Sequence, residues 1–197
     1  MFAKTKPYSL LVASDSILIV IDVQDAFLEK LPGQESERLL DKVCWIVRLA
    51  QWEHIPLIVT AEGLQEQPLA SKLTQTLPAN APIFNKLTFG LADQPDILDA
   101  VEQTNRKTAI LIGLETDVCV MHSAIGLLER GYRVAVVVDA IGTPAPGQEI
   151  GLARMQNAGI IIVNMKSLFY EWLRTVEAVT RFHQELPEMR AAAGITL

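Results

Sequence analysis

Short runs of apolar, β-branched residues alternate along this chain with segments in which apolar residues recur at helical spacing. The run Ser16–Ile21 is apolar throughout after its first residue, which is typical of a strand buried on both faces. The next segment, 34–52, places apolar residues three and four positions apart, which is typical of an amphipathic helix. Because this alternation recurs along the chain, it predicts a parallel sheet with helices on both faces.

The same two patterns set the other expected elements. Further strands are expected at 56–60, 83–86, 108–112, 133–139 and 160–164, and further helices at 69–77, 96–104, 118–129, 148–158 and 166–185. The expected fold class is α/β, a three-layer α/β/α arrangement with a Rossmann-type winding. The chain is expected to form one domain over residues 1–197, with 174–197 as a C-terminal helical extension.

Composition excludes several classes of function. The net charge of −6 provides no basic surface for nucleic acid or for an anionic membrane. The longest apolar runs have the length of strands, and the N-terminal residues lack the apolar core of a signal peptide, so a cytoplasmic location is expected. The chain has two cysteines, Cys44 and Cys119, which form no disulfide framework and fit a reducing compartment.

Cys119 lies where the expected strand 108–112 gives way to the expected helix 118–129. The free N–H groups and the positive dipole end at the first turn of a helix favour thiolate over thiol. This position indicates a cysteine nucleophile, although a lone cysteine is more often a small buried core residue. Cys44 falls on the apolar stripe of the helix 34–52 and is expected in the core.

Two further polar residues follow strands. Asp22 comes directly after Ser16–Ile21, and Lys86 comes at the end of 83–86. Each residue alone is more often a turn aspartate or a solvated lysine. Ligands of open α/β sheets bind outside the carboxyl ends of the strands, so Asp22 and Cys119 would face one crevice if their strands are neighbours. A nucleophile, a base and a cation form the set that covalent catalysis by cysteine needs.

These motifs resemble those of the isochorismatase-like cysteine hydrolases, which include nicotinamidases and N-carbamoylsarcosine amidase. The resemblance rests on residues 21–27 (IDVQDAF), on Lys86 and on residues 113–120 (GLETDVCV), and it spans roughly residues 16–173. Within this superfamily the chain is most similar to the uncharacterised bacterial hydrolases of the YcaC type, which form oligomers. The resemblance therefore also implies a homo-oligomer.

The resemblance implies a six-stranded parallel sheet and a catalytic triad of Asp22, Lys86 and Cys119. It also implies a cis peptide between Leu114 and Glu115, just before the nucleophile. By analogy, the backbone N–H groups of Glu115 and Cys119 would form an oxyanion hole.

The substrate pocket is expected at Gln24, Phe27 and Phe89, together with the segment 61–82, which is expected as a loop with one short helix. Neither the residues nor the resemblance identifies the substrate.

No metal and no other cofactor are expected. Nicotinamidases carry an Asp-x-His pair and a further histidine after the second strand, whereas residues 59–69 of this chain contain no histidine. The histidines, His54, His122 and His183, do not have the spacing of a zinc site. Cys119 itself argues against the reaction of true isochorismatases, which lack this cysteine.

The expected function is hydrolysis of a small-molecule amide or a related C–N bond through a thioester. The alternatives are a catalytically idle oligomeric binding or scaffold protein and a redox-sensing thiol protein; the second is disfavoured because no resolving cysteine is evident.

The expected helix 166–185 carries an apolar stripe for which the other helices leave little core to fill, so it is expected at a subunit interface. The stripe consists of Leu168, Phe169, Trp172, Leu173 and Val176. Packing of this stripe within the chain is the alternative.

Overall fold

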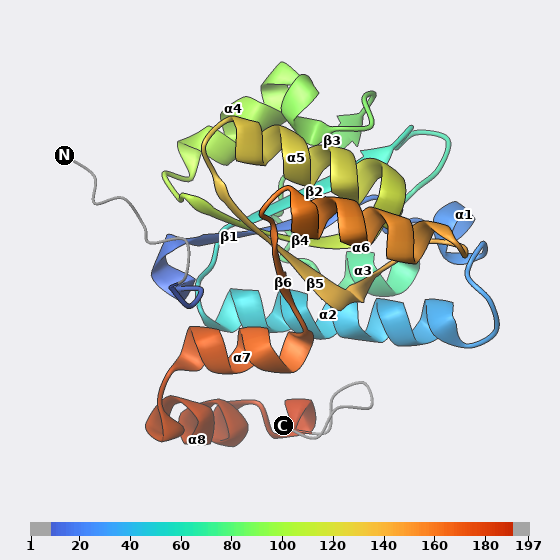
Figure 1. Ribbon diagram of the computed structural model, residues 1–197. Coiled ribbons are helices and arrows are strands. Elements are labelled where there is room, and N and C mark those ends of the chain that lie inside the picture. The colour runs from blue at the N-terminus through green and yellow to red at the C-terminus, as the bar shows by residue number, and fades with distance from the viewer. Residues whose placement is uncertain (1–8, 191–197) are drawn as a thin grey trace.

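Six parallel strands form one sheet in the spatial order β3-β2-β1-β4-β5-β6 (Figure 1). The computed structural model describes residues 9–190. The strands are β1 (Ser16–Ile21), β2 (Leu57–Glu62), β3 (Ile83–Lys86), β4 (Thr108–Leu114), β5 (Arg133–Gly142) and β6 (Ile161–Val163). This arrangement confirms the predicted α/β class and the six-stranded parallel sheet.

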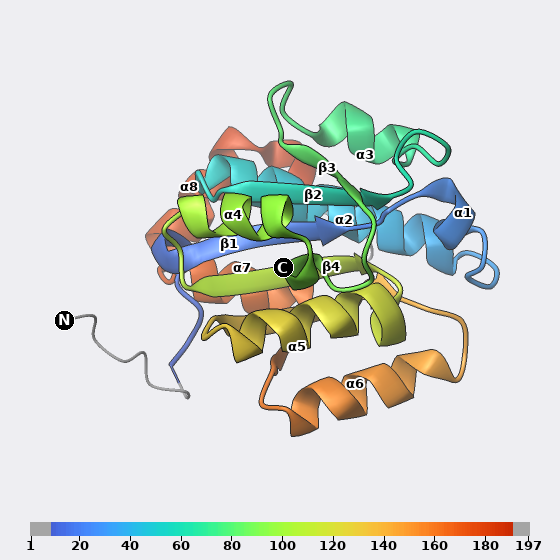
Figure 2. The same ribbon diagram turned by 90° about the horizontal axis from the view of Figure 1, so that it is seen from above.

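Helices cover both faces of the sheet (Figure 1). Figure 2, seen from above, shows α4, α5 and α6 in front of the sheet and α2 and α7 behind it. The α-helices are α1 (Asp25–Leu28), α2 (Glu35–Trp52), α3 (Ser71–Thr76), α4 (Pro95–Gln103), α5 (Met121–Glu129), α6 (Gly147–Asn157), α7 (Met165–Leu173) and α8 (Val176–Glu185). Short 3₁₀ turns lie at Ala13–Asp15, Leu91–Asp93 and Pro187–Met189, and a π-helical turn, η3, lies at Thr116–Val120.

Each face of the sheet has its own apolar core. On β1, Leu18 and Val20 belong to the core beneath α2 and α7, whereas Ile17, Ile19 and Ile21 belong to the core beneath α4 and α5. All six residues of β1 are buried. The strand therefore needs apolar side chains on both faces, which explains its continuous apolar run.

The C-terminal segment packs within the chain, which was the alternative, so the premise that its apolar stripe has no core to fill is wrong. The segment forms two helices that are separated at Arg174, which has a positive φ of 65°. Four residues of the apolar stripe are buried, and Val176 alone of the five is exposed, at 85%. Phe169 contacts Trp45 of α2 edge to face, with ring centroids 5.7 Å apart. The physical reason is that α2 offers an aromatic surface for the stripe.

The described part of the predicted extension 174–197 joins the same core. Phe182 of α8 is fully buried and lies edge to face against Trp52, with ring centroids 5.2 Å apart. The indole N–H of Trp45 donates to the carbonyl of Met189 at 3.1 Å. Residues 191–197 of the extension, and residues 1–8 of the predicted domain, lie outside the described residues.

The order of the strands reverses between β1 and β4, and the two strands are paired so that Ile21 lies opposite Gly113. Gly113 has a φ of 123°, a conformation that other residues rarely adopt. A Cβ atom at this position would overlap the carbonyl oxygen of Ile21. Glycine therefore allows β4 to approach the end of β1 at the point where ligands of open α/β sheets bind.

We expect Gly113→Ala to lower the free energy of unfolding by at least about 2 kcal/mol, because it adds both a strained φ and a steric overlap. Gly33→Ala is the matched control, since Gly33 has a φ of 58° but no neighbouring atom within 4 Å of its Cβ position. The control should show only the φ penalty of about 1–2 kcal/mol. Urea unfolding measures both values, and a Gly113→Ala loss no larger than that of the control would contradict the close approach.

Candidate active site

The structure brings the three predicted catalytic residues together at the carboxyl ends of the strands. The Lys86 Nζ lies 2.9 Å from Asp22 Oδ2 and 3.5 Å from Cys119 Sγ. The Asp22 and Lys86 side chains are fully buried, and Cys119 is 3% exposed. A thiol, a carboxylate and an ammonium therefore share one desolvated cluster.

Asp22 is held in place by the neighbouring strand β2. Its backbone has a φ of 49°, in the left-handed region that aspartate enters more readily than most residues. Its N–H donates to the Thr60 carbonyl at 3.0 Å, and the Thr60 hydroxyl donates to its Oδ1 at 2.8 Å. Within the described residues, Oδ2 has the ion pair with Lys86 but no hydrogen bond of good geometry. This oxygen is therefore available to accept a proton.

Lys86 is surrounded by acceptors. Its ammonium donates to the Thr88 carbonyl at 2.7 Å and to the Cys119 sulfur at 3.5 Å, in addition to the ion pair with Asp22. Burial lowers the pKa of Lys86, but the charges of Asp22 and Cys119 and their hydrogen bonds outweigh this effect, so the pKa lies above its ordinary value. The lysine therefore stays charged within the cluster.

The surroundings of Cys119 favour the thiol over the thiolate that was expected from the sequence. Burial, followed by the charge of Asp22, raises the pKa of Cys119 to about 12, although Lys86 acts in the opposite direction. Cys119 also lies in the π-helical turn Thr116–Val120, ahead of α5, and not in the first turn of an α-helix. Desolvation and neighbouring carboxylates therefore outweigh the helix terminus and the cation.

Helix α6 packs closely against the turn that carries the nucleophile. A Cβ at Gly151 would lie 2.9 Å from the Cα of Asp117, so this glycine lets the helix approach the turn. The Thr143 hydroxyl donates to Asp117 Oδ1 at 2.8 Å, and the Thr116 hydroxyl donates to Gln148 Oε1 at 2.6 Å. These contacts fix the turn on the side away from the strands.

The Leu114–Glu115 peptide that leads into this turn is cis, as the resemblance implied. The Glu115 carbonyl accepts the N–H groups of Val118 and Val120 at 3.2 and 3.1 Å.

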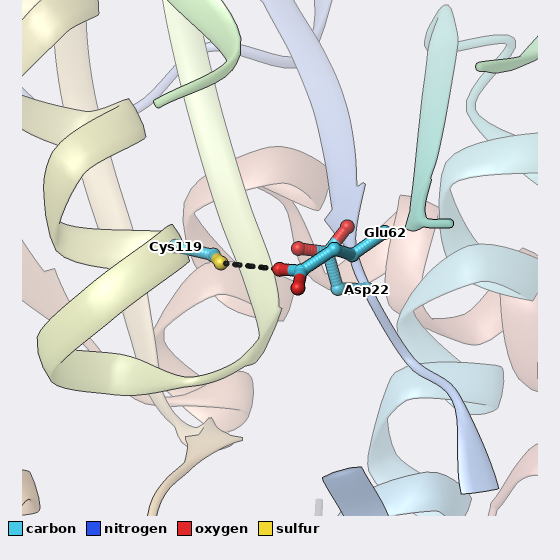
Figure 3. A group of neighbouring side chains, drawn as sticks. All are labelled: Asp22, Glu62 and Cys119. Atoms are coloured by element: carbon cyan, nitrogen blue, oxygen red, sulfur yellow. Dashed lines mark hydrogen bonds between the residues drawn. The ribbon is translucent and has the colours of Figure 1, made fainter. Parts of the chain in front are cut away.

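Glu62 is a member of the cluster that the sequence analysis missed. It is the last residue of β2, and its Oε2 accepts a hydrogen bond from the Cys119 thiol, with 3.7 Å between Sγ and Oε2 (Figure 3). The strand was expected to end at Thr60, so Glu62 was assigned to the following loop. The signal that could have found it is the one that found Asp22, namely an acidic residue at the end of an apolar strand.

Gln24 was predicted to line the substrate pocket, and the structure corrects this role. The side chain is fully buried. Its Oε1 accepts the Glu62 N–H at 2.8 Å, and its Nε2 donates to the carbonyls of Glu62, at 2.9 Å, and of Gln67. The amide is therefore occupied by backbone groups, and it positions Glu62.

The other two predicted pocket residues lie nearer the surface. Phe27 is half-buried, and the Lys30 ammonium lies 4.5 Å from its ring centroid. The same ammonium pairs with the Glu115 carboxylate at 3.1 Å, which connects Phe27 to the residue after the cis peptide. Phe89 is 57% exposed and faces His122 edge to face, with ring centroids 6.2 Å apart.

The cluster also contains groups that can bind metals. One ligand atom each from Asp22, Glu62 and Cys119 lies within 4.8 Å of the other two (Figure 3). Two of these three atoms already face the Lys86 ammonium, which would repel a metal cation. The residues therefore fit a metal poorly, and the absence of a metal requirement stays a prediction.

The model of the Isochorismatase domain family matches residues 16–167. The chain belongs to the isochorismatase family. It is 28% identical to the probable hydrolase YcaC of Escherichia coli over an alignment 194 residues long that covers 94% of this chain and 93% of that protein. No helix within residues 9–190 has both the length and the apolar character needed to span a membrane.

Two solved structures of YcaC proteins are similar throughout. The Escherichia coli structure, described as an octameric hydrolase of unknown specificity, has a TM-score of 0.82 and 28% identity, and covers 94% of this chain and 95% of its own. The Pseudomonas aeruginosa structure, with hexane-2,5-diol and covalent acrylamide, has a TM-score of 0.81 and 27% identity, and covers 92% and 94%.

We expect Lys86→Met to lower the free energy of unfolding by about 3–5 kcal/mol, because it leaves the buried Asp22 carboxylate without a cation. The double variant Asp22→Asn with Lys86→Met should recover part of this loss, since it removes both charges. Urea unfolding of the two single variants and the double variant measures this coupling. If the double variant loses the sum of the two single losses, the pair is not energetically coupled.

Proposed function

We propose that this protein is a cysteine-dependent hydrolase of a small-molecule amide or a related C–N bond, and that it acts through a thioester. The observation that carries the proposal is the contact of the Lys86 ammonium with both Asp22 and Cys119 inside a buried cluster. Buried charged groups are costly unless they are paired, and they concentrate at functional sites.

In the first half of the reaction, the Asp22 carboxylate takes the proton of the Cys119 thiol, and the sulfur attacks the carbonyl carbon of the substrate. The resulting oxyanion is held by the N–H groups of Glu115 and Cys119. The C–N bond then breaks, and the amine leaves with the proton from Asp22. The acyl group remains on the sulfur as a thioester.

In the second half, Asp22 takes a proton from a water molecule, whose oxygen attacks the thioester carbonyl. The C–S bond breaks, the carboxylic acid leaves, and the sulfur regains the proton. Lys86 holds negative charge on the sulfur in both halves, because its ammonium donates to Cys119 Sγ. The net change is the addition of one water molecule to the C–N bond.

The Pseudomonas aeruginosa YcaC structure contains covalent acrylamide, and because acrylamide is an electrophile, it supports the presence of a reactive nucleophile in that relative. One feature favours the alternative of a catalytically idle binding protein: Cys119 is almost fully buried, and this burial raises the pKa of its thiol to about 12. Turnover and covalent labelling distinguish the two functions.

We expect Cys119→Ala to reduce ammonia release from a panel of small primary amides and ureas by at least about a thousandfold, because it removes the nucleophile. Cys44→Ala is the matched control and should keep its activity, since Cys44 lies in the core beneath α2. Intact-protein mass spectrometry after a rapid acid quench should detect the acyl adduct in the wild type and in Cys44→Ala, but not in Cys119→Ala. Undiminished activity in Cys119→Ala would show that another group is the nucleophile, and a wild type that neither turns over nor labels would favour the idle alternative.

We further propose that the protein assembles as a homo-oligomer, which the octameric Escherichia coli relative supports. Light scattering at micromolar concentration should give a mass that is a multiple of the 21.7 kDa chain. The proposed binding partner of the protein is a small-molecule substrate, and no role is proposed for nucleic acid or a membrane. A monomer at that concentration would contradict the proposed assembly and leave the chemistry unaffected.

A further inference from the structure

Glu62 places a second carboxylate beside the nucleophile, and the mechanism described above does not use it. Its Oε2 accepts the Cys119 thiol at 3.7 Å, and its side chain is only partly exposed. The Gln24 side chain holds the backbone of Glu62 through two hydrogen bonds. It accepts from the Glu62 N–H at 2.8 Å and donates to the Glu62 carbonyl at 2.9 Å. The carboxylate therefore belongs to a rigid part of the site.

The described chain provides no cation for this carboxylate. Lys86 is the cation of the cluster, and an ammonium has three donors. The Lys86 ammonium donates to the Thr88 carbonyl and the Cys119 sulfur, and its charge is paired with Asp22 Oδ2. Among the residues that the structure describes, Glu62 forms no ion pair with a lysine, arginine or histidine.

The lack of a cation beside Glu62 within the described residues affects how readily the Cys119 sulfur can become a thiolate. The cluster holds two carboxylates, of Asp22 and Glu62, and one ammonium, so it carries a net negative charge while the thiol is neutral. Forming a thiolate at Cys119 would place a second negative charge beside Glu62. A positive group that binds Glu62 would remove this opposition at the moment when the nucleophile is needed.

We propose that Glu62 determines specificity by binding an ammonium group of the substrate next to the scissile carbonyl, and that this binding favours the attacking thiolate. The inference rests on the proposed amide hydrolysis and names its substrate class. Because the ligand atoms of Asp22, Glu62 and Cys119 lie within 4.8 Å of one another, about one or two carbon atoms fit between the amine and the carbonyl. The class is therefore α- and β-amino amides.

The first test measures the sulfur without any turnover. Glu62→Gln keeps the shape of the side chain and removes its charge, so Cys119 should react with iodoacetamide about tenfold faster than in the wild type at pH 8. Glu66→Gln is the matched control, because Glu66 is exposed four residues later in the chain and has no contact with the sulfur. Mass spectrometry of the peptide containing Cys119 gives the rates. Equal rates in the wild type and Glu62→Gln would overturn the proposal.

The second test measures specificity with isosteric pairs of amides. The wild type should hydrolyse glycinamide with a kcat/KM at least tenfold above that for propionamide, and β-alaninamide should likewise exceed butyramide. Glu62→Gln should abolish both ratios, whereas Glu66→Gln should keep them. A wild type that turns over neutral amides equally well would overturn the proposed substrate class and leave the proposed hydrolysis intact.

Protection of Cys119 separates the failure of this inference from the failure of the proposed function. If no amide is turned over, the proposed hydrolysis fails, and glycinamide should still protect Cys119 from iodoacetamide at lower concentration than propionamide, but only when Glu62 is present. Equal protection by the two amides would overturn the binding role of Glu62. Activity that is lost in a chelator and restored by zinc or manganese would also overturn it, because a metal ion would then be the partner of Glu62.

Discussion

The buried ion pair between Asp22 and Lys86 is the constraint on which the site depends. Both side chains are completely removed from solvent, and their charged atoms lie 2.9 Å apart. Such a pair is rarely more stabilising than well-packed apolar residues of the same volume, yet removing one partner leaves an isolated buried charge. The two strand ends must therefore stay in register, and Thr60 of the intervening strand β2 contributes by donating to the other oxygen of Asp22. An arrangement that costs stability in this way is expected where chemistry requires it.

The order of the strands in the sheet places the remaining groups beside this pair. Asp22 directly follows β1, Glu62 and Lys86 end β2 and β3, and the turn after β4 carries Cys119. The reversal of strand order between β1 and β4 opens the edge at which these groups meet. Gly113 permits the close approach of the two strands there, so a conformational property of one residue sets the position of the nucleophile relative to the acid.

Local patterns in the sequence predicted the elements well, because periodicity reports burial directly. The strands Ser16–Ile21 and Ile83–Lys86 have the expected bounds, and Asp22, Lys86 and Cys119 lie together as expected. What the patterns could not predict depends on contacts distant in the sequence. The extension of β2 to Glu62 requires pairing with β3, and the role of Gln24 requires the Glu62 backbone to lie beside it. Predicting how the C-terminal stripe packs likewise requires the position of the aromatic surface of α2.

The pKa of Cys119 also depends on residues that are distant in the sequence. From the sequence, a helix terminus and one cation favoured the thiolate; Lys86 acts in the expected direction, but Cys119 lies in a π-helical turn ahead of α5. The fold adds desolvation and the carboxylates of Asp22 and Glu62, and together these raise the pKa to about 12. A buried neutral thiol reacts slowly with oxidants and alkylating reagents. A site of this kind resembles an idle one at rest, and a bound group that adds positive charge beside the sulfur would favour the thiolate.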